Sequence, residues 1–96
     1  MNFSFHELAQ TELMSTIDYY EECQAGLGLC FSEEIYATVE RICQFPLAWE
    51  SVDSKTRRCL LSRFPYGILY RIAENEIRVM AIMNLHRKSC YWKDRK

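Results

Sequence analysis

Two apolar stripes at helical spacing, separated by a glycine turn, constrain the fold of this 96-residue chain more than any other feature. Each stripe advances in steps of four, four and three residues, which places its members on one face of a helix. The stripes consist of Ala9, Leu13, Ile17 and Tyr20, and of Phe31, Ile35, Val39 and Ile42. Gly26 and Gly28 lie between the two stripes and favour the end of a helix there. A turn this short predicts an antiparallel helix hairpin over residues 7–45, which ends before Pro46.

The second half of the chain changes from helical spacing to alternation. Residues 57–64, 68–72 and 77–85 have the alternation or β-branched composition of strands, and Phe3 and Phe5 alternate with polar residues near the N-terminus. Short turns join the last three strands, which predicts an antiparallel meander over residues 56–86. We therefore expect one small α+β domain over residues 1–96, in the order β-α-α-β-β-β. The helix hairpin covers one face of a mostly antiparallel, curved sheet, and a basic aromatic tail follows over residues 87–96.

Composition excludes several classes of protein. Hydrophobic residues at 49% and charged residues at 26% are ordinary values for a globular domain. The chain shows no run of about 20 apolar residues and no basic, apolar leader, so we expect a cytoplasmic protein without membrane association. Its five cysteines form no CxxC pair and are expected to be reduced thiols. We expect no metal site and no cofactor.

Charge is distributed unevenly along the chain, although the net charge is only −1. Residues 1–48 contain eight acidic residues and one basic residue, and residues 49–96 contain eleven basic and five acidic residues. This asymmetry suggests a basic working surface, formed by the sheet and tail, on an acidic helical support.

Strand alternation predicts which side chains occupy the sheet face that the helices leave open. Tyr66, Ile68, Tyr70 and Ile72 are expected to face the helices, as are the odd-numbered residues from Ile77 to Leu85. Arg71, Arg78 and Asn84 then share the open face. Arg57 and Arg63 lie on a strand of mixed parity and are further candidates. Such a face binds nucleic-acid phosphates or an acidic protein segment, or it is simply a solvated charged surface.

The tail mixes bases with aromatic side chains. Lys88 and Trp92 are candidates for contact with a target, because cations hold phosphates while aromatic rings stack on bases. Tyr91 and Trp92 are equally consistent with closing a core or with anchoring a protein partner. His86 is a candidate proton carrier, because histidine is the side-chain type used for proton transfer near neutral pH, although a surface histidine often has no such role.

Segments along nearly the whole chain resemble a known family. Residues 63–72 read RFPYGILYRI, residues 77–82 read IRVMAI, and the tail carries Arg87, Tyr91-Trp92 and Arg95. In the front half, HELA at 6–9, YYE at 19–21 and PLAW at 46–49 follow the same order. Together they resemble the RelE/ParE superfamily of toxins from type II toxin–antitoxin modules. The implied fold is the one that the periodicity predicts.

The resemblance implies growth inhibition and plasmid stabilization, with two mechanisms open. RelE-like members are metal-independent mRNA interferases that cut messages on the ribosome, which is our leading expectation. In that case Arg71 binds the phosphate, Arg87 stabilises the transition state and Tyr91 aligns the reacting groups. Many relatives have histidine in place of Asn84, so His86 is the substitute base. ParE-like members instead poison DNA gyrase by binding it without catalysis, and an attenuated, non-toxic member is a third reading.

The resemblance also implies a protein partner. A toxin of this kind is held inactive by a cognate antitoxin, and a basic surface predicts that the antitoxin contributes an acidic or amphipathic segment.

Overall fold

The computed structural model describes residues 1–87 and 90–96. Strand β1 (Asn2–Phe5) leads into helices α1 (Glu7–Cys23) and α2 (Leu27–Gln44), and strands β2 (Glu50–Ser51), β3 (Arg57–Leu60), β4 (Tyr66–Ala73) and β5 (Glu76–Asn84) follow. The sheet order is β1-β5-β4-β3-β2. Among the strand pairs of the described residues, only β1–β5 is parallel. The predicted α+β order is confirmed, with the two-residue β2 as an addition.

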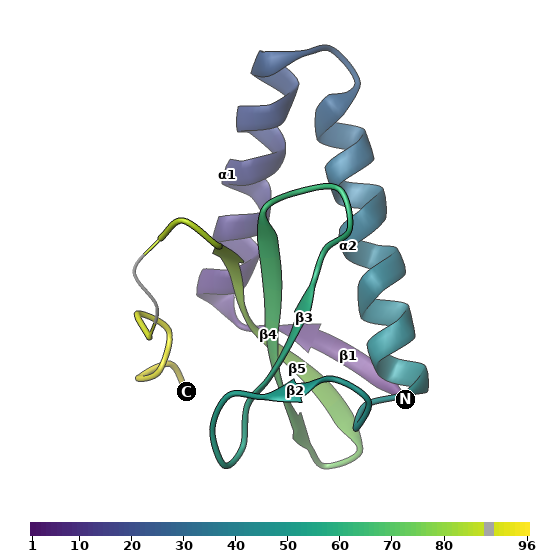
Figure 1. Cartoon of the computed structure of the whole chain (residues 1–96), viewed down its shortest axis with the longest axis vertical. Helices are drawn as coiled ribbons and strands as arrows, with labels where there is room; N and C mark the ends of the chain where they lie inside the picture. Colours follow the sequence, from purple (N-terminus) through teal and green to yellow (C-terminus); the bar gives the residue numbers. More distant parts are fainter. Residues whose placement is uncertain (88–89) are drawn as a thin grey trace.

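The helix hairpin forms as its two stripes predict. The helices lie side by side, and the C-terminal segment lies beyond α1, away from α2 (Figure 1). Phe31, Ile35, Val39 and Ile42 are all fully buried, as is Ala9. Gly26 adopts φ +88° ahead of α2. The Glu21 carboxylate at the end of α1 accepts the amides of Gly26 at 2.9 Å and Gly28 at 3.1 Å, which satisfies two free donors at the start of α2.

Gly28 is required by the close approach of the helices. A Cβ added there would lie 2.6 Å from the backbone oxygen of Ile17, so Gly28→Ala must push the helices apart. We expect a loss of about 1–3 kcal/mol in the free energy of unfolding, the usual range for overpacking, measured by urea denaturation. Leu29→Ala at the exposed neighbouring position is the matched control and should stay within about 0.5 kcal/mol. Equal effects of the two substitutions would contradict this role for Gly28.

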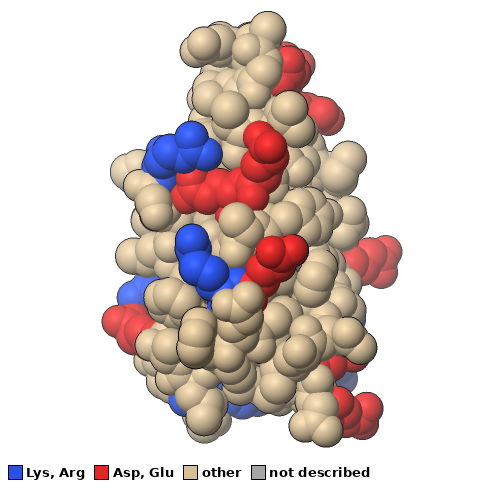
Figure 2. Space-filling view, turned by 90° about the vertical axis from the view of Figure 1, so that its right-hand side faces the viewer, with Lys and Arg blue, Asp and Glu red and all other residues tan. Residues whose placement is uncertain are grey.

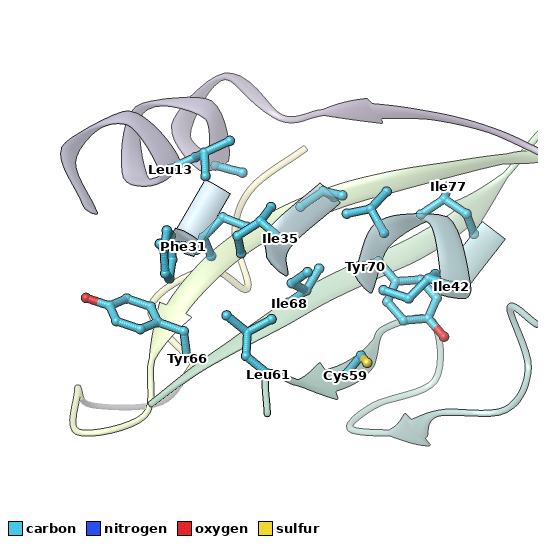
Figure 3. Close-up of a cluster of buried hydrophobic side chains, with 14 residues drawn as sticks. Leu13, Phe31, Ile35, Ile42, Cys59, Leu61, Tyr66, Ile68, Tyr70 and Ile77 are labelled. Atoms are coloured by element: carbon cyan, nitrogen blue, oxygen red, sulfur yellow. The ribbon is translucent and has the colours of Figure 1, made fainter. Parts of the chain in front are cut away.

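The main core fills the space between the hairpin and the sheet. Figure 3 shows side chains of both helices meeting those of the strands, and Tyr66, Ile68, Tyr70 and Ile77 line the sheet side as predicted. Phe31 lies at the centre of an aromatic group, with ring centroids 5.3 Å from Tyr20, 5.1 Å from Phe64 and 5.2 Å from Tyr66.

Tyr70 also fixes the loop that follows α2. Its hydroxyl donates to the carbonyl oxygen of Pro46 at 2.6 Å. Burial raises the pKa of Tyr70 to about 12, so the hydroxyl stays protonated as the donor. The loop is thereby held against the sheet.

A β-bulge corrects the predicted facing of β5. In the β4–β5 ladder Leu69 pairs with Ala81 and Tyr70 with Val79, so Met80 has no partner and alternation reverses beyond it. Ile82 therefore joins the helix-side core, whereas Ala81 and Met83 face the other side. The prediction that all odd-numbered residues from Ile77 to Leu85 face the helices was wrong beyond Val79, and Leu85 is 40% exposed.

Two further expectations about the strands need correction. The strand predicted over residues 57–64 ends at Leu60, because residues 61–65 turn away and send Leu61 and Phe64 into the core. Ile72 was expected to face the helices in the core but is 40% exposed. It opposes the buried Ile77 on β5, but its own side chain lies in an open hollow with Leu47 and Tyr70.

The sheet face opposite the helices is not fully open. Leu69, Ala81 and Met83 form a second buried cluster with Trp92, and Tyr91 packs against it. Trp92 is only 3% exposed, so the tail covers part of the face that the alternation assigned to solvent or a partner.

The acidic and basic halves of the sequence are joined in space. Glu12 pairs with Arg95 and Arg87, and Glu34 pairs with Arg63 at 2.9 Å. On the α2 side of the molecule basic side chains lie directly beside acidic ones (Figure 2), and a hollow there is lined by Glu33, Glu34, Arg41 and Arg63. Acidic residues of the first half therefore form ion pairs with basic residues of the second half. The uneven charge along the chain does more than separate a basic surface from an acidic support.

Candidate functional site

A groove of about 450 Å³ runs between α1 and the end of β5. It exists because β1 pairs with β5 only as far as Val79, which leaves the later part of β5 beside α1. The groove brings together three sequence candidates, Asn84, His86 and Arg87. Its remaining lining residues are Thr11, Glu12, Ser15, Thr16, Tyr66 and Ile82.

Asn84 does not lie on the open sheet face where the alternation predicted it. Because the bulge at Met80 reverses the alternation, Asn84 turns toward the helix side and approaches the Tyr66 hydroxyl at 3.4 Å. It therefore does not share a face with Arg71 and Arg78. Its Oδ1 accepts the backbone amide of His86 at 2.8 Å, which shapes the turn that presents His86 and Arg87.

Glu12 organises the floor of this groove. Its carboxylate accepts the backbone amide of Ile82 at 3.0 Å and two bonds from the Arg95 guanidinium at 3.0 and 2.9 Å. Arg95 also donates to the carbonyl oxygen of Met80 at 2.9 Å. These two side chains thus bond the edge of β5 where β1 has ended. Arg87 approaches the same carboxylate at 4.0 Å.

Arg87 and Tyr91 stack on each other. The guanidinium carbon of Arg87 lies 3.9 Å from the Tyr91 ring centroid, and that of Arg95 lies 5.0 Å away. Burial, together with the negative charge of Glu12, raises the pKa of Tyr91 well above its ordinary value. The Tyr91 hydroxyl therefore remains protonated and buried, whereas the Arg87 side chain is 56% exposed.

Arg71 and Arg78 lie on the sheet face opposite the helices. Arg71 donates from Nε to the Thr56 hydroxyl at 2.9 Å and from Nη1 to the carbonyl oxygen of Arg95 at 3.1 Å. Arg78 reaches the Ser4 hydroxyl and the Phe5 carbonyl oxygen, both at 3.4 Å. Arg71 does not line the groove that holds Arg87 and His86.

The other predicted target-binding residues are dispersed. Arg57 donates to the carbonyl oxygens of Trp49 at 2.7 Å and Leu47 at 3.3 Å. Arg63 is tied to Glu34 beside α2, so it does not join Arg71 on the open face. Trp92 closes the second cluster, which fits the core-closing alternative. Lys88 lies outside the described residues.

Sequence reasoning missed Glu12 and Arg95 as parts of the site. Glu12 precedes the stripe residue Leu13 by one position, which places it at the margin of the buried helix face. That position was the available signal, but the partners lie 70 and 83 residues away along the chain.

The described residues contain no group of three or more His, Cys, Asp or Glu side chains that could hold a metal ion. In the same part of the chain, no helix has the length and apolar character needed to cross a membrane.

Comparisons with known proteins agree with this fold. The family model described as "ParE toxin of type II toxin-antitoxin system, parDE" matches residues 3–88. A solved structure titled "Chromosomal ParDE TA system from P. aeruginosa" superposes with a TM-score of 0.78 at 20% sequence identity, covering 88% of this chain and 96% of that one. No curated protein sequence matches the chain. Because the family match spans nearly the whole chain, the protein belongs to the ParE toxin family of type II toxin–antitoxin systems.

Proposed function

We propose that this toxin inhibits growth by binding DNA gyrase, and not by cutting messenger RNA. The sequence favoured RNA cleavage as the leading mechanism, with gyrase poisoning as the alternative. Membership of the ParE family favours the alternative.

The observation that carries the proposal is that the residues which RNA cleavage would need do not all line one groove. Arg87 and His86 line the groove on the α1 side, whereas Arg71 is bonded to Thr56 and Arg95 on the opposite sheet face. Catalysis of phosphoryl transfer requires cations and acid–base groups within hydrogen-bond reach of one phosphate. The Tyr91 hydroxyl is buried with a raised pKa, and Asn84 replaces a possible base with an amide. This arrangement suits a protein-binding surface better than an active site.

Arg87 is the residue we expect to matter most for target binding. Its side chain is exposed, positively charged and held in place by Tyr91 and Glu12, and pre-oriented arginines are frequent hot spots in protein interfaces.

The test is a DNA supercoiling assay with purified gyrase and purified toxin. We expect loss of supercoiling together with gyrase-dependent linear DNA. We expect Arg87→Ala to raise the inhibitory concentration at least about tenfold, equivalent to 1.4 kcal/mol. Arg41→Ala, an exposed arginine on α2, is the control and should leave inhibition unchanged.

A parallel measurement maps messenger RNA ends after brief expression. Intact messages with an SOS response support the proposal. Sharp cuts within translated messages, with gyrase fully active, would overturn it in favour of RNA cleavage. Absence of growth arrest in an expressing strain would identify an attenuated member.

As a type II toxin, the protein has an antitoxin partner. We further propose that an acidic or amphipathic antitoxin segment covers Arg87 and the groove, because opposite charge and steric cover together block a binding surface. Antitoxin added to the supercoiling assay should restore gyrase activity.

A further inference from the structure

The two edges of the sheet differ in how they are protected. On one side the sheet ends with β2, which has only two residues and whose Glu50 forms an ion pair with Arg58 on β3. On the other side it ends with β1, purple in Figure 1, whose sequence NFSF contains neither a charge nor a proline. Folded proteins commonly protect an edge strand by extreme shortness, charge or proline. The β2 edge has the first two of these features, whereas β1 has neither charge nor proline.

The backbone of β1 directs hydrogen-bonding groups to its outer side. β1 is parallel to β5 with Phe5 opposite Val79, and the amide of His6 donates to the carbonyl oxygen of Val79 at 2.8 Å. Backbone groups of alternate residues in a strand point to the same side, so those of Ser4 point toward β5, as the His6 amide does. The amides and carbonyl oxygens of Phe3 and Phe5 then point outward. Within residues 1–87 and 90–96, no strand pairs with this outer edge.

An aromatic surface lies beside the same edge. Phe3, Phe5 and Tyr36 of α2 form a triangle, with ring centroids 6.0 Å apart for the two phenylalanines and 6.4 and 6.1 Å from each of them to Tyr36. Phe3 is 39% exposed and Tyr36 is 41% exposed. We call these three residues the aromatic edge patch. A strand added at this edge would bond the outward backbone groups and cover the exposed rings together.

We infer that the occupant of this edge is a second copy of the chain, which pairs its own β1 antiparallel to this one about a two-fold axis at Ser4. In this register Phe3 of each copy lies opposite Phe5 of the other. Both residues of such a pair direct their backbone groups outward, so each pair exchanges both backbone hydrogen bonds. The Phe5 carbonyl oxygen already receives a contact from Arg78 at 3.4 Å, and its second lone pair is available to the other copy.

Self-pairing suits the chemistry of the aromatic edge patch. A two-fold contact brings the same surface of both copies together, and NFSF has no charge that would meet its own copy. Phe3 and Phe5 of the two copies would form aromatic cross-strand pairs, which stabilise antiparallel strands. An acidic segment, such as the one proposed for the Arg87 groove, finds no opposite charge among the three aromatic residues. Because the paired strands are short, we expect a weak dimer that depends on protein concentration.

The test measures association of the full-length toxin by analytical ultracentrifugation over a series of concentrations. We expect a reversible equilibrium between monomer and dimer. Phe3→Lys places a charge of each copy in the contact and should raise the dissociation constant at least about tenfold. Leu60→Lys makes the same change at an exposed position on β3, on the other side of the sheet, and should leave association unchanged.

A second variant tests the aromatic edge patch without altering β1. Tyr36→Lys lies on α2, so the strand keeps its sequence, and we expect weaker association here as well. Thermal unfolding of each variant shows that it is folded. If Phe3→Lys failed to fold, Tyr36→Lys would decide the outcome, and its association at the level of the unsubstituted protein would overturn the inference.

A cross-linking experiment tests the register. Ser4 of one copy would lie directly opposite Ser4 of the other in a pair without backbone hydrogen bonds, where the Cα atoms approach closely enough for a disulfide. Under mild oxidation Ser4→Cys should therefore form covalent dimers faster than the unsubstituted protein, which has five cysteines of its own. Ser15→Cys, at an exposed position on α1, is the control and should not.

Amide hydrogen exchange separates a second copy from other occupants. Slower exchange of the Phe3 and Phe5 amides at higher toxin concentration supports the inference. A toxin that is monomeric at every concentration would overturn it. Protection of these amides only after antitoxin is added would overturn it as well, and would assign the edge to the antitoxin. None of these measurements involves gyrase, so the inference stands or fails apart from the proposed function.

Discussion

Glu12→Ala should lower the free energy of unfolding by about 3–5 kcal/mol, the range observed when one member of a buried ion pair is removed. The side chains of Glu12 and Arg95 are only 15% and 11% exposed. The substitution leaves the Arg95 charge without its carboxylate and the Ile82 amide without its acceptor. Because Arg95 also bonds the Met80 carbonyl oxygen, the C-terminal segment should detach from the sheet.

Urea denaturation measures the change in the free energy of unfolding. Amide hydrogen exchange at Ile82 measures the loss of the local hydrogen bond to Glu12. Glu22→Ala, at an exposed position on the same helix, is the matched control and should change stability by no more than about 0.5 kcal/mol. Glu12→Gln keeps an acceptor but loses the charge, so its effect should be intermediate. If Ile82 exchanged at the same rate in Glu12→Ala and the unsubstituted protein, the proposed role of Glu12 would be wrong.

Phe31→Ala should cost about 3–5 kcal/mol, the range for removing a buried aromatic ring. Phe31 is fully buried, and its ring contacts those of Tyr20, Phe64 and Tyr66. The substitution opens a cavity that joins α1, α2 and the turn before β4. For a chain of this length each kcal/mol shifts the melting temperature by roughly 4–8 °C.

Phe45→Ala provides a control of the same chemistry. The Phe45 side chain is 61% exposed at the end of α2, so its removal should shift stability by no more than about 0.5 kcal/mol. Thermal unfolding followed by circular dichroism separates the two variants. Similar melting temperatures would show that the aromatic group is not the centre of the core.

The helix hairpin could be predicted because its information is local. The spacing of the stripe from Phe31 to Ile42 is itself the geometry of a buried helix face, and all four of its residues are buried. Gly28 marked the turn by its position between the two stripes. The structure gives a second reason for a glycine there, because α1 passes too close for a Cβ.

The facing of β5 could not be predicted because its alternation was ambiguous. Residues 79–83 are apolar at every position, so either register buries an apolar set. The partner strand decides the outcome, and the bulge at Met80 places Arg78 and Asn84 on opposite faces. A straight strand would have placed both on the sheet face that carries Arg71.

The sequence by itself determined the element order, the buried helix stripes and the residue types available for binding, because spacing along the chain sets which side chains share a face. Only the tertiary structure decided which charges meet. Glu12 and Arg95 are 83 residues apart, and Arg71 opposes Arg78 only because of strand register. Ion pairing and cross-strand contact depend on distances between chain segments, and those distances exist only once the segments have packed.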